Sequence, residues 1–176
     1  ADAKVVRRVL AFHEPGLDRL VAEMVAQGSL SATTDLHAAV TATDITLIAV
    51  GTPDKDGHID LSQIKAAAEN IGAALRFKPG YHVVAVKSTV VPGTTDETVI
   101  GLCMNPEFLR EGTAIEDFMT PDRVVIGASD ARAAGFFGEL YEQFDCPKVI
   151  VSLRNAEFIK YASNALLATL ISFSNE

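Results

Sequence analysis

Residues 45–50 have the sequence Ile45-Thr46-Leu47-Ile48-Ala49-Val50, a short apolar run that ends at Gly51. An apolar run without polar alternation is typical of a strand that is buried on both faces of a sheet. A second such run extends from His82 to Lys87, and a helix is predicted between the two, from Leu61 to about Arg76. The order strand, helix, strand predicts a parallel pair of strands joined by a crossover helix.

The same alternation continues toward both ends of the chain. Further strands are predicted at Leu102–Met104, Arg123–Gly127 and Lys148–Val151, and further helices at Leu17–Gln27, from Asp35 through Val40, from about Thr94, and at Ala131–Phe144. Asp35 is the predicted cap of its helix, and Asp60 with Gln63 three residues later forms a capping-box pattern before the helix at Leu61. Residues 54–57 are polar and end in Gly57, which predicts a turn. The pattern as a whole predicts an α/β fold with a mostly parallel sheet.

The chain ends in a long apolar segment that predicts a helix from Asn155 to Phe173. No strand is predicted after it, so we expect two units: a sheet domain at 1–152 and the start of a helical domain at 153–176. Lys160 and Asn164 are four residues apart and therefore share one face of this helix. Lys160 either extends its ammonium to solvent, with Asn164 solvated beside it, or lies in a polar cleft. The residues alone leave both interpretations open.

Composition restricts the class of protein. The 176 residues are 48% hydrophobic, which is enough to bury a substantial core, and the net charge of −8 disfavours broad nucleic-acid binding. Two isolated cysteines do not form a disulfide framework, and the four histidines do not form a metal-type pair, so we expect a reducing compartment and no metal. No apolar run is long enough to cross a bilayer, and we expect a soluble, cytoplasmic protein without a membrane partner.

Two predicted strands are followed by hydroxyl-bearing residues. Thr52 comes after the first strand, in Val50-Gly51-Thr52-Pro53, and Thr89 after the second, in Lys87-Ser88-Thr89-Val90. Open parallel sheets bind ligands beyond the carboxyl ends of their strands, so the two segments predict a shared cofactor edge. Taken singly, each is also explained as a plain turn. The chain contains no Gly-x-Gly-x-x-Gly fingerprint for a pyrophosphate.

The most charged segment near a predicted strand runs from Asn105 to Gly112 and holds Glu107, Arg110 and Glu111 within five residues. From composition alone, the favoured interpretation is a solvated turn with both glutamates on the outer face of a helix. The alternative is a functional site, because the segment returns directly to a β-branched strand through residues 120–127.

These segments resemble the UDP-glucose/GDP-mannose dehydrogenase family, and most of all its bacterial UDP-glucose 6-dehydrogenase branch. The resemblance extends over almost the whole chain and is carried by Glu14-Pro15-Gly16-Leu17, Val50-Gly51-Thr52-Pro53, Asp60-Leu61-Ser62, Lys87-Ser88-Thr89-Val90 with Pro92-Gly93-Thr94-Thr95, residues 105–127, and Lys160-Tyr161-Ala162-Ser163-Asn164-Ala165. Pro121-Asp122-Arg123 is more similar to the UDP-glucose branch. The resemblance implies a Rossmann-like sheet that lacks its first strands here, followed by the start of a long central helix.

The resemblance also implies a function, namely NAD-dependent oxidation of the C6 alcohol of a nucleotide sugar, UDP-glucose to UDP-glucuronate, through a cysteine thioester. By motif, Thr52, Thr89 and Glu111 would contact NAD, and Glu107, Lys160 and Asn164 would be catalytic. The predicted substrate-binding residues are Glu107, Phe108, Leu109, Arg110, Glu111, Lys160 and Asn164. Relatives dimerise through the long helix, so the resemblance implies a homodimer.

The chain departs from the family at both ends. It lacks the family's first strand with the glycine loop and the downstream motif of the catalytic cysteine, and neither Cys103 nor Cys146 matches that motif. We therefore expect a fragment that is inactive alone and that associates through the apolar edge left by the missing strand. A non-catalytic remnant that acts as a binding module without NAD turnover is the alternative.

Overall fold

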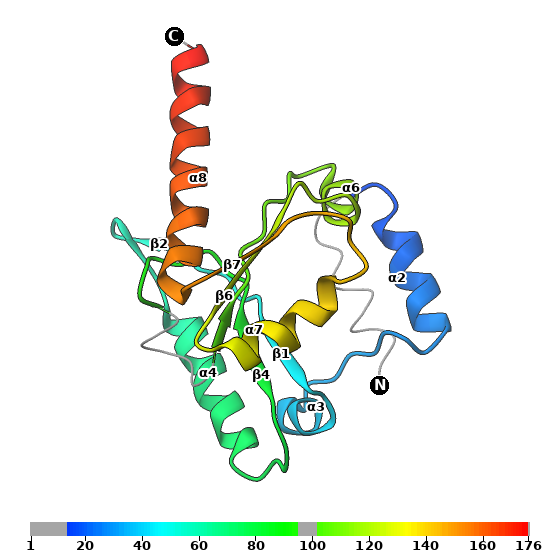
Figure 1. The fold of residues 1–176 in the computed structure, drawn as a ribbon. Coiled ribbons are helices and arrows are strands. Elements are labelled where there is room, and N and C mark those ends of the chain that lie inside the picture. The colour runs from blue at the N-terminus through cyan, green and yellow to red at the C-terminus, as the bar shows by residue number, and fades with distance from the viewer. Residues whose placement is uncertain (1–13, 95–101, 176) are drawn as a thin grey trace.

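The computed structural model describes residues 14–94 and 102–175, which form one α/β fold (Figure 1). The central sheet contains β1 (Ile45–Ile48), β4 (Val83–Val86), β5 (Leu102–Met104), β6 (Val124–Ala128) and β7 (Lys148–Val151), in this spatial order. Three of the strand pairs are parallel, and β5 with β6 is antiparallel. The predicted fold class, a mostly parallel Rossmann-like sheet, is confirmed.

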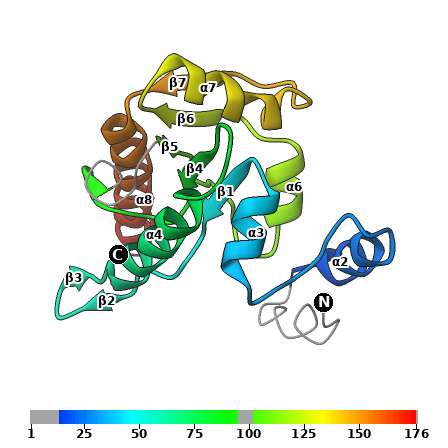
Figure 2. The ribbon, with the colours of Figure 1, turned by 90° about the horizontal axis from the view of Figure 1, so that it is seen from below.

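Helices connect most of these strands and cover both faces of the sheet, whereas α2 precedes β1 and lies to one side (Figure 1 and Figure 2). Their bounds are α2 (Leu17–Ala26), α3 (Leu36–Ala42), α4 (Ser62–Leu75), α6 (Ala114–Met119), α7 (Ala131–Gly138), the 3₁₀ turn η1 (Glu139–Tyr141) and α8 (Leu153–Asn175). A small hairpin of β2 (Asp54–Lys55) and β3 (His58–Ile59) precedes α4. α8 extends far beyond the sheet, and its last turns lie outside the body of the fold (Figure 1).

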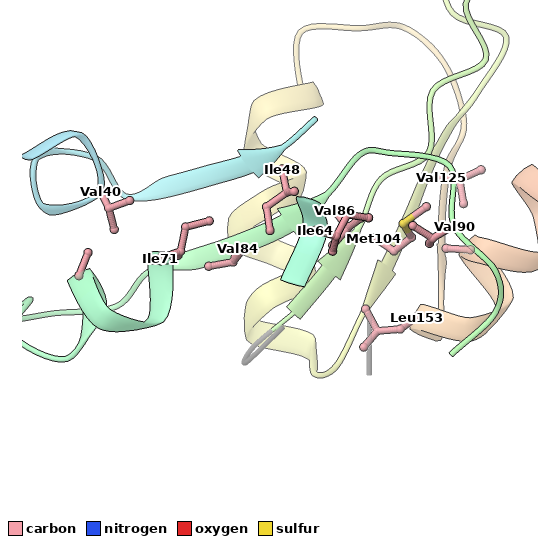
Figure 3. Close-up of a cluster of buried hydrophobic side chains, with 12 residues drawn as sticks. Val40, Ile48, Ile64, Ile71, Val84, Val86, Val90, Met104, Val125 and Leu153 are labelled. Carbon is pink, nitrogen blue, oxygen red and sulfur yellow. The ribbon is translucent and has the colours of Figure 1, made fainter. Parts of the chain in front are cut away.

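The core has two apolar layers, one on each face of the sheet, because successive residues of a strand point to opposite faces. On one face, Val84 and Val86 pack with residues of α3, α4 and the start of α8 (Figure 3). On the other face, Val83 and Ala85 pack with α7 and η1 (Figure 2). Two-sided burial explains why β4 is apolar at every position.

Some local predictions need correction. The capping box before α4 is wrong, because the Asp60 carboxylate accepts the Ser62 N–H at 2.8 Å while Leu61 takes the N-cap position without a side-chain bond. The turn at residues 54–57 is the tip of a hairpin, in which Asp56 and Gly57 have positive φ. The helix predicted from residue 131 through residue 144 ends at Gly138 and continues only as a 3₁₀ turn. The helix predicted from about Thr94 lies almost wholly outside the described residues.

Asp35 caps α3 as predicted, since its carboxylate accepts the Ala38 N–H at 2.9 Å. The start of α8 lies directly against β6, where a Cβ on Gly127 would be 2.7 Å from the Ala156 Cβ and 3.1 Å from the Leu153 Cα. Only glycine, which has no Cβ, permits this close approach. The contact fixes the position of the start of α8 on the sheet, and with it the position of Lys160. None of the helices in residues 14–94 and 102–175 has the length and apolar character of a membrane span.

Candidate active site

A cavity of about 630 Å³ lies at the edge of the sheet where β4 and β5 end. Its lining combines residues that are far apart in the sequence: Lys87, Asn105, the loop Pro106–Arg110, Glu116, Asp117, Phe118, residues 120–124, Tyr141, and Lys160, Ser163, Asn164 and Leu167 of α8. The charged loop after β5 and the lysine-bearing face of α8 therefore share one cavity. This is the edge at which parallel sheets bind ligands.

An ion pair joins the loop to the helix. The Lys160 Nζ lies 2.8 Å from the Glu107 Oε1, and the side chains of Lys160 and Glu107 are 7% and 33% exposed. The other carboxylate oxygen of Glu107 accepts the Leu109 N–H at 2.8 Å. Burial favours neutral Glu107, but the hydrogen bonds from Lys160 and Leu109 outweigh this effect, and the pKa of Glu107 lies below its ordinary value. Glu107 is therefore an ionised, oriented carboxylate, and Lys160 is not a solvent-exposed lysine.

Asn105 is the buried centre of a hydrogen-bond network beside this pair. Its Oδ1 accepts the Lys87 Nζ at 3.0 Å and the Tyr141 hydroxyl at 2.5 Å, and its Nδ2 donates to the Val125 carbonyl at 2.9 Å. The Asn105 backbone N–H donates to the Val86 carbonyl at 2.9 Å. The network ties the ends of β4 and β5 to β6 and η1, so the residue before the loop is held rigidly.

The rest of the loop is anchored by two carboxylates. Asp117 of α6 accepts the Arg110 backbone N–H at 2.8 Å and its guanidinium at 2.6 and 3.1 Å, and these bonds lower the pKa of Asp117 to about 2. Glu14 accepts the N–H groups of Gly112 and Ile115 at 2.9 and 3.3 Å. A segment almost a hundred residues away in the sequence thus supports the turn after the loop.

Phe108 places an aromatic ring beside the ion pair. The Arg123 guanidinium lies 4.8 Å and the Lys160 Nζ 5.4 Å from the ring centroid, both within the range of cation–π attraction. Phe108 is half-buried and lines the cavity, so it combines an apolar wall with support for two cations.

The segments predicted to form a cofactor edge also meet. The Thr52 hydroxyl donates to the Thr89 carbonyl at 2.9 Å, and the Ser88 hydroxyl donates to the Val50 carbonyl at 2.6 Å. These bonds link the chain after β1 to the chain after β4. Both threonines are half-buried. The two segments therefore meet at one edge of the sheet, as predicted, because hydrogen bonds join them.

The predicted site residues are mostly brought together. Phe108, Leu109, Arg110 and Asn164 line the cavity that holds the Glu107–Lys160 pair, whereas Glu111 is exposed and does not line it. For Glu111 the solvated-turn interpretation describes the observed position, and its contact with NAD stays a prediction. Residues 105–112 are not helical, so the outer-helix interpretation of Glu107 is wrong.

The two cysteines do not contribute a nucleophile to the cavity lining. Cys103 is fully buried, its thiol donates to the Ala133 carbonyl at 3.7 Å, and burial raises its pKa to about 12. A thiol with such a pKa stays protonated and unreactive.

Sequence reasoning missed three buried or half-buried polar residues. The sequence motifs contain Lys87 and Asn105 but give neither a role of its own, although both line the cavity and hydrogen bond each other at 3.0 Å. No motif contains Glu157, which is fully buried and accepts the Gly93 N–H at 2.5 Å, a bond that ties the segment after β4 to α8. A charged residue on the apolar face of a helix is the signal that would have identified Glu157.

Comparison with known proteins agrees with this geometry. Residues 3–145 match the family model described as "UDP-glucose/GDP-mannose dehydrogenase family, NAD binding domain". The chain belongs to this family. UDP-glucose 6-dehydrogenase of Rhizobium meliloti is 49% identical over 185 residues, covering 95% of this chain and 42% of the relative. GDP-mannose 6-dehydrogenase of Pseudomonas savastanoi is 40% identical over 179 residues, covering 93% of this chain and 41% of the relative.

Two solved structures of the UDP-glucose/GDP-mannose dehydrogenase family superpose closely on the chain. A ternary complex of GDP-mannose dehydrogenase from Pseudomonas aeruginosa has a TM-score of 0.93 at 37% identity and covers 97% of this chain and 43% of that one. UDP-glucose dehydrogenase from Pyrobaculum islandicum has a TM-score of 0.90 at 44% identity and covers 99% and 44%. The chain spans about two fifths of the length of these relatives, and its matched region is the family's NAD-binding domain.

Proposed function

We propose that the protein carrying this chain oxidises the C6 alcohol of UDP-glucose to the carboxylate of UDP-glucuronate, with NAD as the hydride acceptor. The observation that carries the proposal is the Lys160–Glu107 pair at 2.8 Å inside a cavity at the ligand edge of an NAD-binding domain. Oxidation of an alcohol to an acid removes two hydrides in succession. Hydride loss from C6, and hydrolysis by water of the cysteine thioester that the family resemblance implies, would both place negative charge on the oxygen bound to C6, where a cation stabilises it.

The segments after β1 and β4 fit the cofactor. Thr52 and Thr89 are the residues that we assign to NAD, because their hydrogen bond joins two strand ends at the edge where such sheets bind ligands. NAD, when bound, supplies the hydride acceptor. The sequence contains no glycine fingerprint, and we assign no pyrophosphate contact to residues 1–176.

Lys160 and Asn164 supply the electrostatic part of the chemistry. An ammonium and an amide, one turn apart on α8 and lining one cavity, can donate hydrogen bonds to the oxygen at C6 as it becomes negative. In a site shielded from bulk water, one such donor is worth about 10²–10³ in turnover. Lys160 is 5% exposed, so its charge is poorly screened by solvent.

Glu107 supplies the base. Its carboxylate is ionised because its pKa lies below the ordinary value, and its position beside Lys160 puts it next to the same oxygen. An ionised carboxylate can accept a proton from the water that releases the acid. Phe108, Leu109 and Arg110 follow it along the cavity, and we assign them to the sugar nucleotide.

UDP-glucose is proposed over GDP-mannose on the basis of sequence. Three relatives named for UDP-glucose are 49%, 44% and 43% identical to this chain, whereas relatives named for GDP-mannose are 39–40% identical. Pro121-Asp122-Arg123, which lines the cavity, favours the same branch.

We also propose a homodimer that forms through α8. This helix exposes large apolar side chains along its length, with Phe158 at 60%, Leu166 at 61%, Leu170 at 53% and Phe173 at 79%. Apolar faces of this kind are covered by partners in most proteins. Sedimentation of wild type and of Leu170→Asp tests the proposal, since the charge should shift a dimer toward monomer, and a monomeric wild type would contradict it.

The function is tested by measuring NADH formation by the full-length protein with UDP-glucose and, separately, GDP-mannose. The proposal predicts two NADH per UDP-glucose consumed and slower or no reaction with GDP-mannose. GDP-mannose as the faster substrate would reverse the assignment. No NADH with either sugar would favour the non-catalytic binding module.

A further inference from the structure

Lys87 lies between the proposed cofactor edge and the substrate cavity. It follows β4 directly, lines the cavity, and is two residues before Thr89. Its Nζ donates to the buried Asn105 Oδ1 at 3.0 Å, and this oxygen also accepts the Tyr141 hydroxyl. Among the described residues this is the one hydrogen bond of the Lys87 ammonium, so two of its three N–H donors are unused at the cavity wall.

The inner part of the cavity, defined here by Lys87, Glu107 and Lys160, has a surplus of positive charge. Lys87 interacts electrostatically with both Glu107 and Lys160, so two ammonium groups face one carboxylate. The other charged lining residues are exposed or paired: Glu116, Asp122 and Arg123 are exposed, and Arg110 and Asp117 bind each other. Burial lowers the pKa of Lys87, and the charge of Lys160 lowers it further while Glu107 raises it. Holding a second ammonium there costs free energy unless an anion offsets it.

We propose that Lys87 is an anion-binding residue of this cavity that holds the carboxylate product together with Lys160. The inference rests on the proposed function, in which a neutral C6 alcohol becomes a carboxylate. A bound carboxylate would bring the inner cavity to two cations and two anions, whereas the alcohol would leave one cation in excess. The hydrogen bond to Asn105, whose Oδ1 also accepts the Tyr141 hydroxyl, holds the Lys87 ammonium at the cavity wall.

The test compares the affinity of the protein for the proposed substrate with its affinity for the proposed product. Titration calorimetry at pH 8 without NAD measures binding of UDP-glucose and UDP-glucuronate to the full-length protein and to Lys87→Met. For UDP-glucuronate we expect a loss of about 10-fold or more, the lower range for a hydrogen bond to a charged group, and for UDP-glucose a change of less than about 3-fold. Lys65→Met removes the same charge from the exposed side of α4 and should change neither affinity.

Lys87→Gln separates charge from structure. Glutamine keeps an N–H donor that can bond the Asn105 Oδ1, so it serves if the methionine variant does not fold, and the same selective loss is expected. Equal losses for both ligands would mean that Lys87 only supports the loop, and no loss would mean that it does not reach the ligand. Either result overturns the inference. Failure of wild type to bind either ligand would instead overturn the proposed function and, with it, the inference.

Discussion

Breaking the Lys160–Glu107 pair from its two sides should have unequal effects on stability. Glu107→Gln leaves the Lys160 ammonium, in a side chain that is 7% exposed, without its carboxylate. Lys160→Met leaves a Glu107 side chain that is 33% exposed and that still accepts the Leu109 N–H. An unpaired buried charge is far more costly than one that water can reach.

The magnitude follows from this burial. Removing one partner of a fully buried pair costs about 3–5 kcal/mol and removing one of an exposed pair about 0–1 kcal/mol, so we expect Glu107→Gln to cost about 2 kcal/mol and Lys160→Met less than about 1 kcal/mol. The double variant should be no less stable than Glu107→Gln alone, because it removes the unpaired ammonium.

Hydrogen–deuterium exchange of peptides from the first half of α8 measures the free energy of local opening there, and so reports the cost of each variant. The measurement can be made on the chain described or on a longer protein that contains it. The difference in stability between wild type and Glu107→Gln should vanish as the pH falls through the lowered pKa of Glu107, since the pair stabilises the fold only while the carboxylate is ionised. A Lys160→Met variant that is less stable than Glu107→Gln would show that the unpaired Lys160 ammonium is not the costlier of the two charges.

Three further predictions concern the rest of the fold. Burial, together with the charge of Lys78, lowers the pKa of His82 below 6.5, so the folded state favours the neutral imidazole. The free energy of unfolding in urea should therefore keep the full contribution of His82 above pH 6.5 and lose it as the pH falls. The same loss in His82→Gln would contradict this. In native Cys146→Ser, buried Cys103 with its pKa near 12 should not react with a thiol reagent at pH 8, and labelling as fast as in urea would disprove the burial. Gly127→Ala should lower stability by about 1–3 kcal/mol, since its Cβ would meet α8, whereas Gly72→Ala in open space should raise it by about 0.5–1 kcal/mol; equal thermal shifts would rule out the close approach.

The strands are the part of the fold that the sequence predicts best. The strand at Leu102–Met104 has the predicted limits and is an apolar, largely buried run between Gly101 and Asn105. The strand at Lys148–Val151 also has the predicted limits, although it is an edge strand in which Lys148 and Ile150 are exposed. The capping box was wrong for a local reason, since the Asp60 carboxylate bonds an N–H two residues ahead instead of three. Local turns in which an aspartate bonds an N–H two or three residues ahead differ little in free energy, so a sequence pattern does not tell them apart.

The site, like the fold, has features that the sequence predicts and features that it does not. Sharing of one helix face by Lys160 and Asn164 follows from spacing, but the partner of Lys160 lies more than fifty residues away, and only the family resemblance indicated it. The Asn105 network was missed because its bonds join residues separated by 18 to 36 positions, and no local pattern encodes such contacts. The close approach at Gly127 depends likewise on a helix from another part of the chain.

We propose that Lys160 and Glu107 form the reacting end of a nucleotide-sugar site. A crystal structure of the full-length protein with NADH and UDP-glucuronate tests this placement directly. We expect a C6 carboxylate oxygen within hydrogen-bond distance of the Lys160 Nζ, with Glu107 beside it and the ligand along Phe108–Arg110. A ligand bound in another cavity, with the Lys160–Glu107 pair intact and distant from C6, would show that the pair is not the reacting end.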